Sequence, residues 1–295
     1  MAEIVALAAA GATALVSCEG AELRSWQPAG GPELMWHGDP AHWPFWAPLL
    51  FPIVGALKDD QCRWGGKTYG MFRHGFTRFK PFRPLEGDDA CARFLLTDDE
   101  QTRAEYPFAF RLTATYVLTA RAIELQFAVV NPSNEAMPYA VGWHPAFLWP
   151  FAGGAKEGYR MAFDADEAAM IPAFTPGGLV RRDPRPSPLV DRGFALRPEL
   201  FPVSAFVFPN AKSKAMAFSA SDGSAIVFSA EDMPHLVVWT KPTSPPFVSL
   251  EAWTALPDPE DAEGDLAAKP GMLWLPPGET ARHSARVMWR PPKER

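Results

Sequence analysis

The fold is decided by residues 111–130, which read RLTATYVL, TAR and AIELQFAVV in three consecutive pieces. In the last piece, Ile, Leu, Phe and Val occupy alternate positions, and the polar residues Glu124 and Gln126 lie between them. A period of two is typical of a β-strand with one buried face and one exposed face. We therefore predict strands at 111–118 and 122–130, joined through the short TAR break as an antiparallel hairpin.

The same alternation recurs in further pairs of segments. A first hairpin is predicted at 4–18, and the turn signal SDGS at 221–224 predicts another. The chain is expected to close with a hairpin whose turn is PPGE at 276–279. The paired strands are 215–219 with 225–229, 236–240 with 247–253, and 272–275 with 281–289. Many short neighbouring strands of this kind indicate an all-β protein with antiparallel sheets.

Composition supports the all-β interpretation. The chain has 295 residues, and its 32 Pro and 22 Gly interrupt helices but suit short strands joined by turns. Large β-sandwiches and barrels reach this length as one domain. Because the sequence shows neither an internal repeat nor a linker, residues 1–295 are predicted to form a single domain.

Charge and cysteine content restrict the classes of function. The net charge of −6 argues against a nucleic-acid partner, and no basic amphipathic or long apolar stretch indicates a membrane. The cysteines are odd in number and widely spaced, at Cys18, Cys62 and Cys91. This pattern predicts neither a disulfide framework nor a zinc site. Because unpaired cysteines fit a reducing compartment, it favours a cytoplasmic location. Residues 4–18 end in LVSC, which resembles a lipoprotein cleavage box. The first basic residue is Arg24, however, so we interpret this segment as the first hairpin.

Two long segments are predicted to be loops. Residues 172–198 are rich in proline, and residues 257–270 are acidic. Loops of this length in a compact domain are often functional. We expect the first to be mainly a solvated surface segment, and for the second a functional and a solvated role remain equally open.

Two histidines stand in unusual local contexts. His74 lies in RHGFTR at 73–78, where the following glycine lets the backbone bend tightly and the arginines make a positive field. His144 lies in GWHPAF at 142–147, where Pro145 holds it in an extended conformation. Each has a plain structural alternative, a solvated loop histidine for the first and a core histidine bonded to a backbone carbonyl for the second.

A glutamate ends an apolar strand. Residues 247–250 read FVSL and run directly into Glu251. Burial raises the pKa of a carboxyl group, and a raised pKa suits a general base near neutral pH. The alternative is a salt bridge to one of the arginines. Glu251, His144 and His74 can form an acid–base set if the fold brings them together, which their spacing alone does not establish.

The order of these three motifs resembles the aldose 1-epimerase family, in its shorter bacterial branch. Further segments agree with that branch and together cover nearly the whole chain. They are GAELRS at 20–25, ELMWHGDP at 33–40 followed by Trp43, LFPIVG at 50–55, GKTY at 66–69, FVSLEAW at 247–253, GDL at 264–266 with Lys269, and PGE at 277–279.

The resemblance implies a β-supersandwich of two large antiparallel sheets with a sugar cleft, and acid–base chemistry without metal or cofactor. It implies that Glu251 takes the proton from the anomeric hydroxyl of an aldohexose. His144 would protonate the ring oxygen, and His74 would hydrogen-bond to that oxygen or a neighbouring hydroxyl. The substrate-binding residues expected beside them are Arg73, Trp143 and Trp253. At least one of the two tryptophans is expected to stack on the sugar, and core packing is the alternative role for both.

The sequence departs from the family pattern at two places. Ser204 stands near the position where the branch often has an acidic residue, and Ala252 stands where related members tend to have proline. These differences affect the expected contacts with substrate hydroxyls and leave the acid–base residues in place.

The sequence leaves other functions open. A hexose-6-phosphate 1-epimerase could use Arg73, Arg78, Lys80 and Arg83 to hold the phosphate, because arginine matches phosphate oxygens in a bidentate manner. A non-catalytic carbohydrate-binding protein could share the fold, although both histidines and the glutamate are retained. A zinc site at His37 and His42 lacks a third ligand. The sugar and the oligomeric state are not determined by the sequence.

Overall fold

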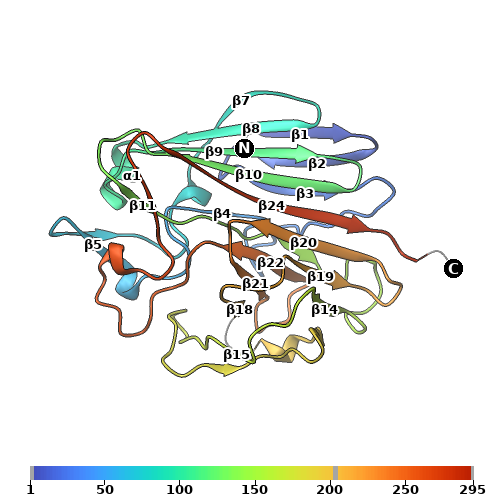
Figure 1. Cartoon of the computed structure of the whole chain (residues 1–295). Helices are drawn as coiled ribbons and strands as arrows, with labels where there is room; N and C mark the ends of the chain where they lie inside the picture. The colour runs from blue at the N-terminus through green and yellow to red at the C-terminus, as the bar shows by residue number, and fades with distance from the viewer. Residues whose placement is uncertain (1–2, 202–204, 294–295) are drawn as a thin grey trace.

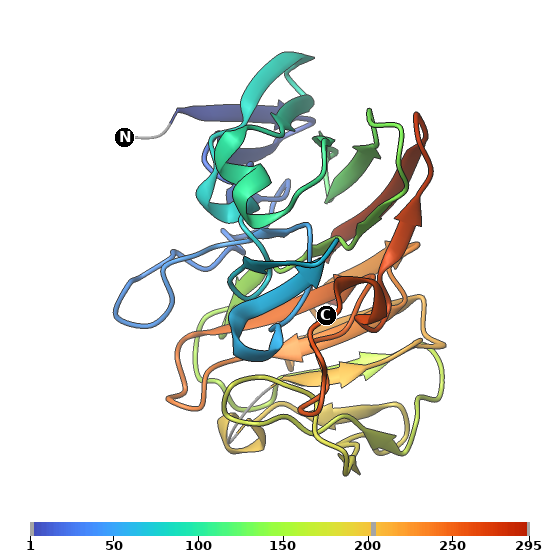
Figure 2. The same ribbon diagram turned by 90° about the vertical axis from the view of Figure 1, so that its left-hand side faces the viewer.

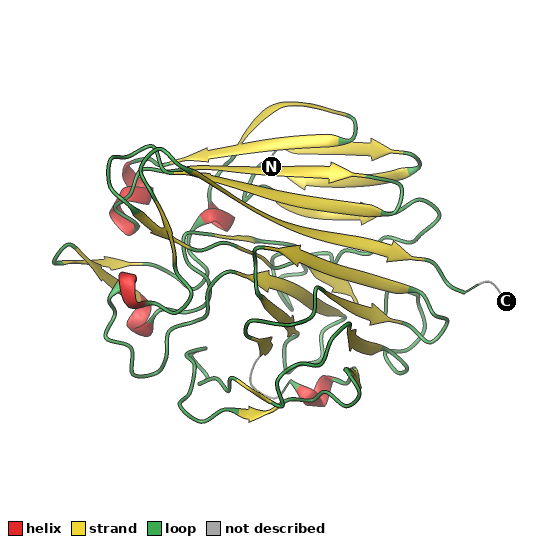
Figure 3. Cartoon of the chain, in the orientation of Figure 1, coloured by secondary structure: helices red, strands yellow, loops and turns green. Residues whose placement is uncertain are grey.

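A computed structural model describes residues 3–201 and 205–293, which form mainly antiparallel β-structure (Figure 1, Figure 3). The deciding hairpin is confirmed: β9 (Arg111–Leu118) and β10 (Ala122–Val130) have the predicted bounds and pair antiparallel. Alternate residues of β9 are buried from Leu112 to Leu118, as the period of two requires. The predicted all-β fold class with antiparallel sheets is therefore correct.

The first layer is a nine-stranded sheet in the order β17–β14–β19–β20–β24–β10–β9–β8–β7. The predicted pair at 215–219 and 225–229 is confirmed by β19 and β20, and both lie in this sheet. The bounds of the strands not yet given are β7 (Arg83–Asp88), β8 (Cys91–Thr97), β14 (Arg160–Phe163), β17 (Gly193–Ala195), β19 (Ala215–Ser219), β20 (Ala225–Glu231) and β24 (Thr280–Arg290).

The second layer contains two smaller sheets, seen behind the first in Figure 1 and from the side in Figure 2. The three-stranded sheet β1–β2–β3 packs against β8 and β9, and the six-stranded sheet packs through β22 against β20. The three-stranded sheet consists of β1 (Ile4–Ala9), β2 (Ala12–Ser17) and β3 (Glu22–Gln27). The six-stranded sheet has the order β18 (Phe206–Phe208), β21 (His235–Trp239), β22 (Phe247–Trp253), β12 (Gly142–Trp143) and β4 (Leu49–Leu50), with β13 (Ala146–Leu148) also paired to β22.

The remaining elements among the described residues are short strand pairs and helices. The pairs are β5 (Gln61–Trp64) with β6 (Lys67–Gly70), β11 (Met137–Tyr139) with β23 (Leu273–Leu275), and β15 (Met170–Ile171) with β16 (Arg185–Pro186). The α-helix α1 (Glu100–Glu105) begins with a capping box between Asp99 and Thr102. The 3₁₀ helices are Lys58–Asp60, Thr77–Phe79, Pro198–Leu200 and Leu266–Ala268. Across residues 3–201 and 205–293, none of the helices has the length and apolar character needed to cross a membrane.

The predicted closing hairpin is wrong. β23 pairs with β11, whereas β24 lies between β10 and β20 and pairs with both. Since both edges of β24 are occupied in this way, no edge remains for β23. The turn at 276–279 therefore carries the chain from one sheet to another instead of closing a hairpin. The predicted hairpin at 4–18 is confirmed by β1 and β2, and β21 pairs with β22 as expected.

Candidate active site

Strand β22 places three polar or aromatic side chains on one face. Successive residues of a strand point to opposite sides of the sheet, so Ser249, Glu251 and Trp253 share a face. Leu250 and Ala252 lie between them and belong to the buried core. The Glu251 side chain is 1% exposed, and its Oε2 accepts a hydrogen bond of 2.9 Å from the Trp253 indole N–H.

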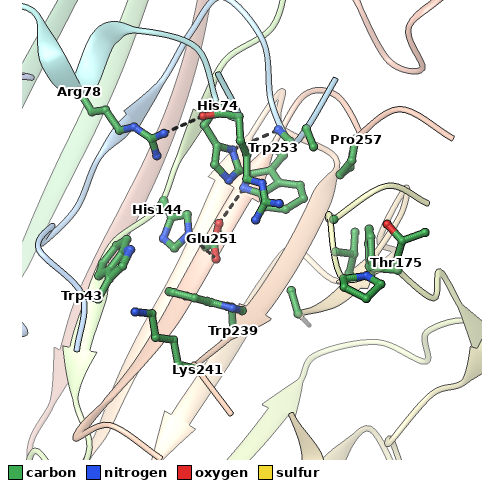
Figure 4. Close-up of a pocket in the computed structure, with 18 residues that line it drawn as sticks. Trp43, His74, Arg78, His144, Thr175, Trp239, Lys241, Glu251, Trp253 and Pro257 are labelled. Carbon is green, nitrogen blue, oxygen red and sulfur yellow. Dashed lines mark hydrogen bonds and ion pairs between the residues drawn. The ribbon is translucent and has the colours of Figure 1, made fainter. Parts of the chain in front are cut away.

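His144 reaches Glu251 from the segment between β12 and β13. Its Nε2 lies 3.2 Å from Glu251 Oε1, and its Nδ1 lies 2.9 Å from Ser249 Oγ. Among the described residues, Glu251 Oε1 has no hydrogen-bond partner, because its contact with His144 is close but not aligned as a hydrogen bond. The carboxylate therefore has one oxygen held in place and one buried oxygen that faces His144 without an aligned hydrogen bond (Figure 4).

His74 lies beside this pair. Its ring is 5.7 Å from that of His144 and 5.7 Å from that of Trp253, measured between centroids. His74 has a φ of 68°, and its Nδ1 accepts a hydrogen bond of 3.1 Å from the backbone N–H of Gly55. The predicted tight bend is present, because Gly75 also has positive φ and a Cβ there would lie 2.1 Å from a backbone oxygen of Phe51.

Burial shifts the acid–base properties of all three groups. It raises the pKa of Glu251 well above the ordinary value, against the opposing effects of the neighbouring Trp253 and Ser249 side chains. Burial lowers the pKa of His144 to about 3 and lowers that of His74 well below 6.5. Burial therefore makes Glu251 a stronger base when ionised and His144 a stronger acid when protonated.

These residues line a pocket of about 370 Å³, within the roughly 300–1,000 Å³ of small-molecule sites. Aromatic side chains form much of its wall (Figure 4). Trp43 stacks on the His144 ring at 4.9 Å, and Trp239 meets the same ring edge-on at 5.2 Å. Phe174 and Trp253 also line the pocket. Flat apolar faces beside hydrogen-bonding groups are suited to a sugar, which has both C–H surfaces and hydroxyls.

Three cations and one carboxylate line the pocket among the described residues. The cations are Arg73, Arg78 and Lys241, and the carboxylate is Glu251. The Arg78 guanidinium lies over the rings of Phe45 and Phe79, at 5.1 and 4.7 Å from their centroids. Burial, together with the charge of Arg73, lowers the pKa of Arg78 to about 10, so Arg78 stays charged at neutral pH.

The structure brings most of the predicted site residues together. Glu251, His144, His74, Arg73 and Trp253 line one pocket. Of the other proposed phosphate ligands, Arg78 lines it, whereas Lys80 and Arg83 do not. Ser204 lies outside the described residues.

Trp143 requires a correction. Its side chain is fully buried and packs against Tyr116 and Phe228, which belong to the nine-stranded sheet. Trp143 precedes His144 by one position, and the two side chains point to opposite faces of the six-stranded sheet. Trp143 is therefore part of the core between the two layers rather than a substrate contact, and Trp253 is the predicted tryptophan that reaches the pocket.

Sequence reasoning missed Trp239, Lys241 and residues 174–178 as pocket residues. Trp239 pairs with Ser249 across β21 and β22, so the register of this predicted strand pair could have placed it on the site face. The segment 174–178 was expected to be mainly solvated, but Phe174, Thr175, Pro176 and Gly178 line the pocket. In the sequence this segment shows only its proline content, which does not distinguish a loop over a site from a loop in solvent.

Comparison with known proteins agrees with this arrangement. The aldose 1-epimerase family model matches residues 3–286. The chain is 30% identical to the plasmid-encoded protein LacX of Lactococcus lactis subsp. lactis over 275 residues, which cover 90% of this chain and 92% of that protein.

Two solved structures share the fold over nearly their whole length. A galactose mutarotase related enzyme from Lactobacillus acidophilus superposes with a TM-score of 0.92 at 29% identity, covering 99% of each chain. A galactose mutarotase-like protein from Lactobacillus casei superposes with a TM-score of 0.89 at 26% identity, covering 98% of this chain and all of that one. With the match over residues 3–286, these similarities establish that the chain belongs to the aldose 1-epimerase family.

Proposed function

We propose that this protein is an aldose 1-epimerase that interconverts the α and β anomers of an aldohexose by acid–base ring opening. The observation that carries the proposal is the contact of 3.2 Å between Glu251 Oε1 and His144 Nε2, two residues that line the pocket. The anomeric hydroxyl and the ring oxygen are bonded to the same carbon. Two groups this close can therefore serve both oxygens at once.

The reaction needs one proton shared between the two groups. Glu251 as carboxylate takes the proton of the anomeric hydroxyl, the bond from C1 to the ring oxygen breaks, and His144 Nε2 gives its proton to that oxygen. The open aldehyde then rotates about the bond between C1 and C2. Ring closure on the other face returns each proton to its source, so the pair ends as it began. Without sugar, the shared proton lies on Glu251, whose pKa is raised, and His144 is neutral. Sugar hydroxyls that hydrogen-bond to the carboxylate stabilise its charged form, so that the proton lies on His144 Nε2 before ring opening.

The shifted pKa values support these roles. A carboxylate whose pKa is raised takes a proton more readily, and an imidazolium whose pKa is lowered gives one more readily. Trp253 supports the base by holding Glu251 Oε2, while Oε1 lies beside His144 Nε2 without an aligned partner. The aromatic walls formed by Trp43 and Trp239 are suited to the apolar faces of the ring.

The test is anomer exchange, followed by polarimetry or by NMR, with a panel of free hexoses and their 6-phosphates. We expect the protein to accelerate exchange of at least one sugar above the rate in buffer. A protein that binds a sugar of the panel without accelerating its exchange would be a non-catalytic carbohydrate-binding protein, and the proposal would be wrong.

The charge of the pocket favours a second candidate, a hexose-6-phosphate 1-epimerase. Arg73, Arg78 and Lys241 can each pair with phosphate oxygens, and Glu251 is the one acid among the described lining residues. Lys241→Ala should then raise KM for the phosphorylated sugar while leaving that for the free sugar nearly unchanged. Lys80→Ala is a matched control, since it removes the same charge outside the pocket. An equal effect on both sugars of Lys241→Ala, and likewise of Arg73→Ala and Arg78→Ala, would exclude this candidate.

A further inference from the structure

The hydrogen bonds around Ser249 determine which nitrogen of His144 carries a proton. Ser249 Oγ lies 2.8 Å from the carbonyl oxygen of Pro145 and 2.9 Å from His144 Nδ1. Two oxygens 2.8 Å apart need a hydrogen between them, and a carbonyl can only accept, so the hydroxyl donates to Pro145. The contact with His144 is then a hydrogen bond only if Nδ1–H donates to the Ser249 oxygen. Nδ1 therefore keeps its hydrogen, and Nε2 is the nitrogen that gains and loses one.

The surroundings of His74 impose the opposite arrangement. Its Nδ1 accepts a hydrogen bond from the backbone N–H of Gly55, and a backbone N–H can only donate. Nδ1 must therefore lack a hydrogen, and a neutral His74 carries its hydrogen on Nε2. Protonation of both ring nitrogens would break this hydrogen bond in a buried position, which is unfavourable. His74 can thus donate a hydrogen bond from Nε2, but its other nitrogen is not available to take up a proton.

We propose that Ser249 is a positioning residue that holds His144 in the Nδ1–H form, while Gly55 holds His74 in the Nε2–H form. The two neighbouring histidines consequently have different tasks. His144 exchanges a proton at Nε2, next to Glu251 Oε1, whereas His74 offers a permanent hydrogen-bond donor to a sugar oxygen. This division of tasks rests on the proposed function, but the two protonation patterns are properties of the protein itself.

The direct test is NMR of the wild-type protein without sugar at neutral pH. Two-bond ¹H–¹⁵N spectra distinguish protonated from unprotonated ring nitrogens, and each histidine is assigned through bonds from its own backbone. We expect His144 to show a protonated Nδ1 and an unprotonated Nε2, and His74 to show the reverse. The same pattern in both rings, or a doubly protonated ring in either, would overturn the proposal. Because this measurement needs no activity, it is independent of whether the protein is an epimerase.

A substitution tests the role of Ser249 itself. Ser249→Ala removes the acceptor for Nδ1–H, so we expect the spectrum of His144 to show a mixture of the two neutral forms. The rate constant kcat should fall by roughly 10-fold, which is less than the roughly 10²–10⁴-fold contributed by a complete general acid. Ser17→Ala is the matched control, because it removes another buried serine hydroxyl in β2, away from the pocket. An unchanged His144 spectrum in folded Ser249→Ala would show that Ser249 does not position the ring.

Discussion

At the residue scale, the function of Glu251 depends on what each of its oxygens contacts. Oε2 is fixed by the Trp253 indole, while Oε1 faces His144 without an aligned hydrogen bond. A buried carboxylate oxygen without a partner is unfavourable in a purely structural role, since the cost is not offset within the protein. The arrangement is explained if Oε1 accepts a proton from a ligand in the pocket.

Removal of the proposed base is the first prediction. Glu251→Gln keeps the shape of the side chain but cannot take a proton, so kcat should fall by about 10²–10⁴-fold. His144→Asn should cost a similar factor, and the double variant should lose little more, because the two groups act in one proton relay. Polarimetric rates of the three variants test this. Glu124→Gln on β10 is the control, and wild-type activity in Glu251→Gln would show that another group is the base.

Substitution of the two tryptophans beside the proposed acid–base residues should affect the pH profile of activity differently. Trp253→Phe removes the hydrogen bond to Glu251, so the pKa of the carboxyl should rise and the acid limb of the kcat profile should move to higher pH. Activity at neutral pH should fall roughly 10- to 100-fold, since hydrogen bonds to charged groups contribute about 1.5–3 kcal/mol.

Trp143→Phe provides the comparison for Trp253→Phe. It leaves a cavity in the core between the sheets, so it should lower the free energy of unfolding without moving the pH profile. A profile that shifts equally in both variants would contradict the separate placement of the two side chains.

Local context drew attention to Glu251, His144 and His74, and the resemblance to the family supplied their expected roles. The structure places all three at one pocket, and their roles as acid and base stay a prediction. The face to which a side chain points was harder to predict. Trp143 and His144 are adjacent, and only the pairing of β12 with β22 assigns one to the core and the other to the pocket. Lys241 could not be recognised, because nothing in its local sequence distinguishes it from a surface lysine.

At the element scale, alternation predicted strands well and their long-range partners poorly. β9 and β10 are neighbours in sequence, and their turn fixes their pairing. β24 instead pairs with β10 and β20, which lie far from it in the chain. The alternation of apolar residues in β24 predicts that one of its faces is buried. It does not indicate which strands pair with β24 on either side.

The central place of β24 leads to a prediction. Arg286 is exposed but pairs with Glu124 on one side and Ser229 on the other. Arg286→Pro should lower the free energy of unfolding by more than the roughly 0.5–1.5 kcal/mol of one hydrogen bond, because proline also disturbs the local backbone. Glu86→Pro is the control, since it lies in the irregular part of the edge strand β7. Equal denaturant midpoints for the two variants would contradict the observed sheet order.

At the scale of the whole molecule, charge is distributed unevenly. The chain has a net charge of −6, yet the described pocket residues include three cations and a single carboxylate. A positive pocket in an acidic protein attracts anionic ligands locally while the remaining surface repels them. This contrast makes the comparison of free and phosphorylated hexoses the most informative part of the substrate panel.

Stability toward acid is also a property of the whole molecule, since several buried groups contribute with opposite signs. His74, His144 and His235 have lowered pKa values in the folded state, chiefly because they are buried, with about 3 for His144 and about 4 for His235. Unfolding restores the ordinary value, so the unfolded chain binds more protons below pH 6.5 and stability falls as the pH falls toward 4. Burial raises the pKa of Glu22 to about 6, which acts in the opposite direction between pH 6 and 4.5.

His235 allows one of these contributions to be isolated, because it lies outside the pocket and accepts a hydrogen bond from the Asn210 backbone N–H at Nδ1. In His235→Asn the amide oxygen can accept the same hydrogen bond but cannot take up a proton. The wild type should therefore lose stability relative to the variant as the pH falls from 6.5 to 4.5, by roughly 2 kcal/mol. Denaturant unfolding at both pH values measures this difference. A difference that is the same at both pH values would mean that His235 binds protons equally in the folded and unfolded states.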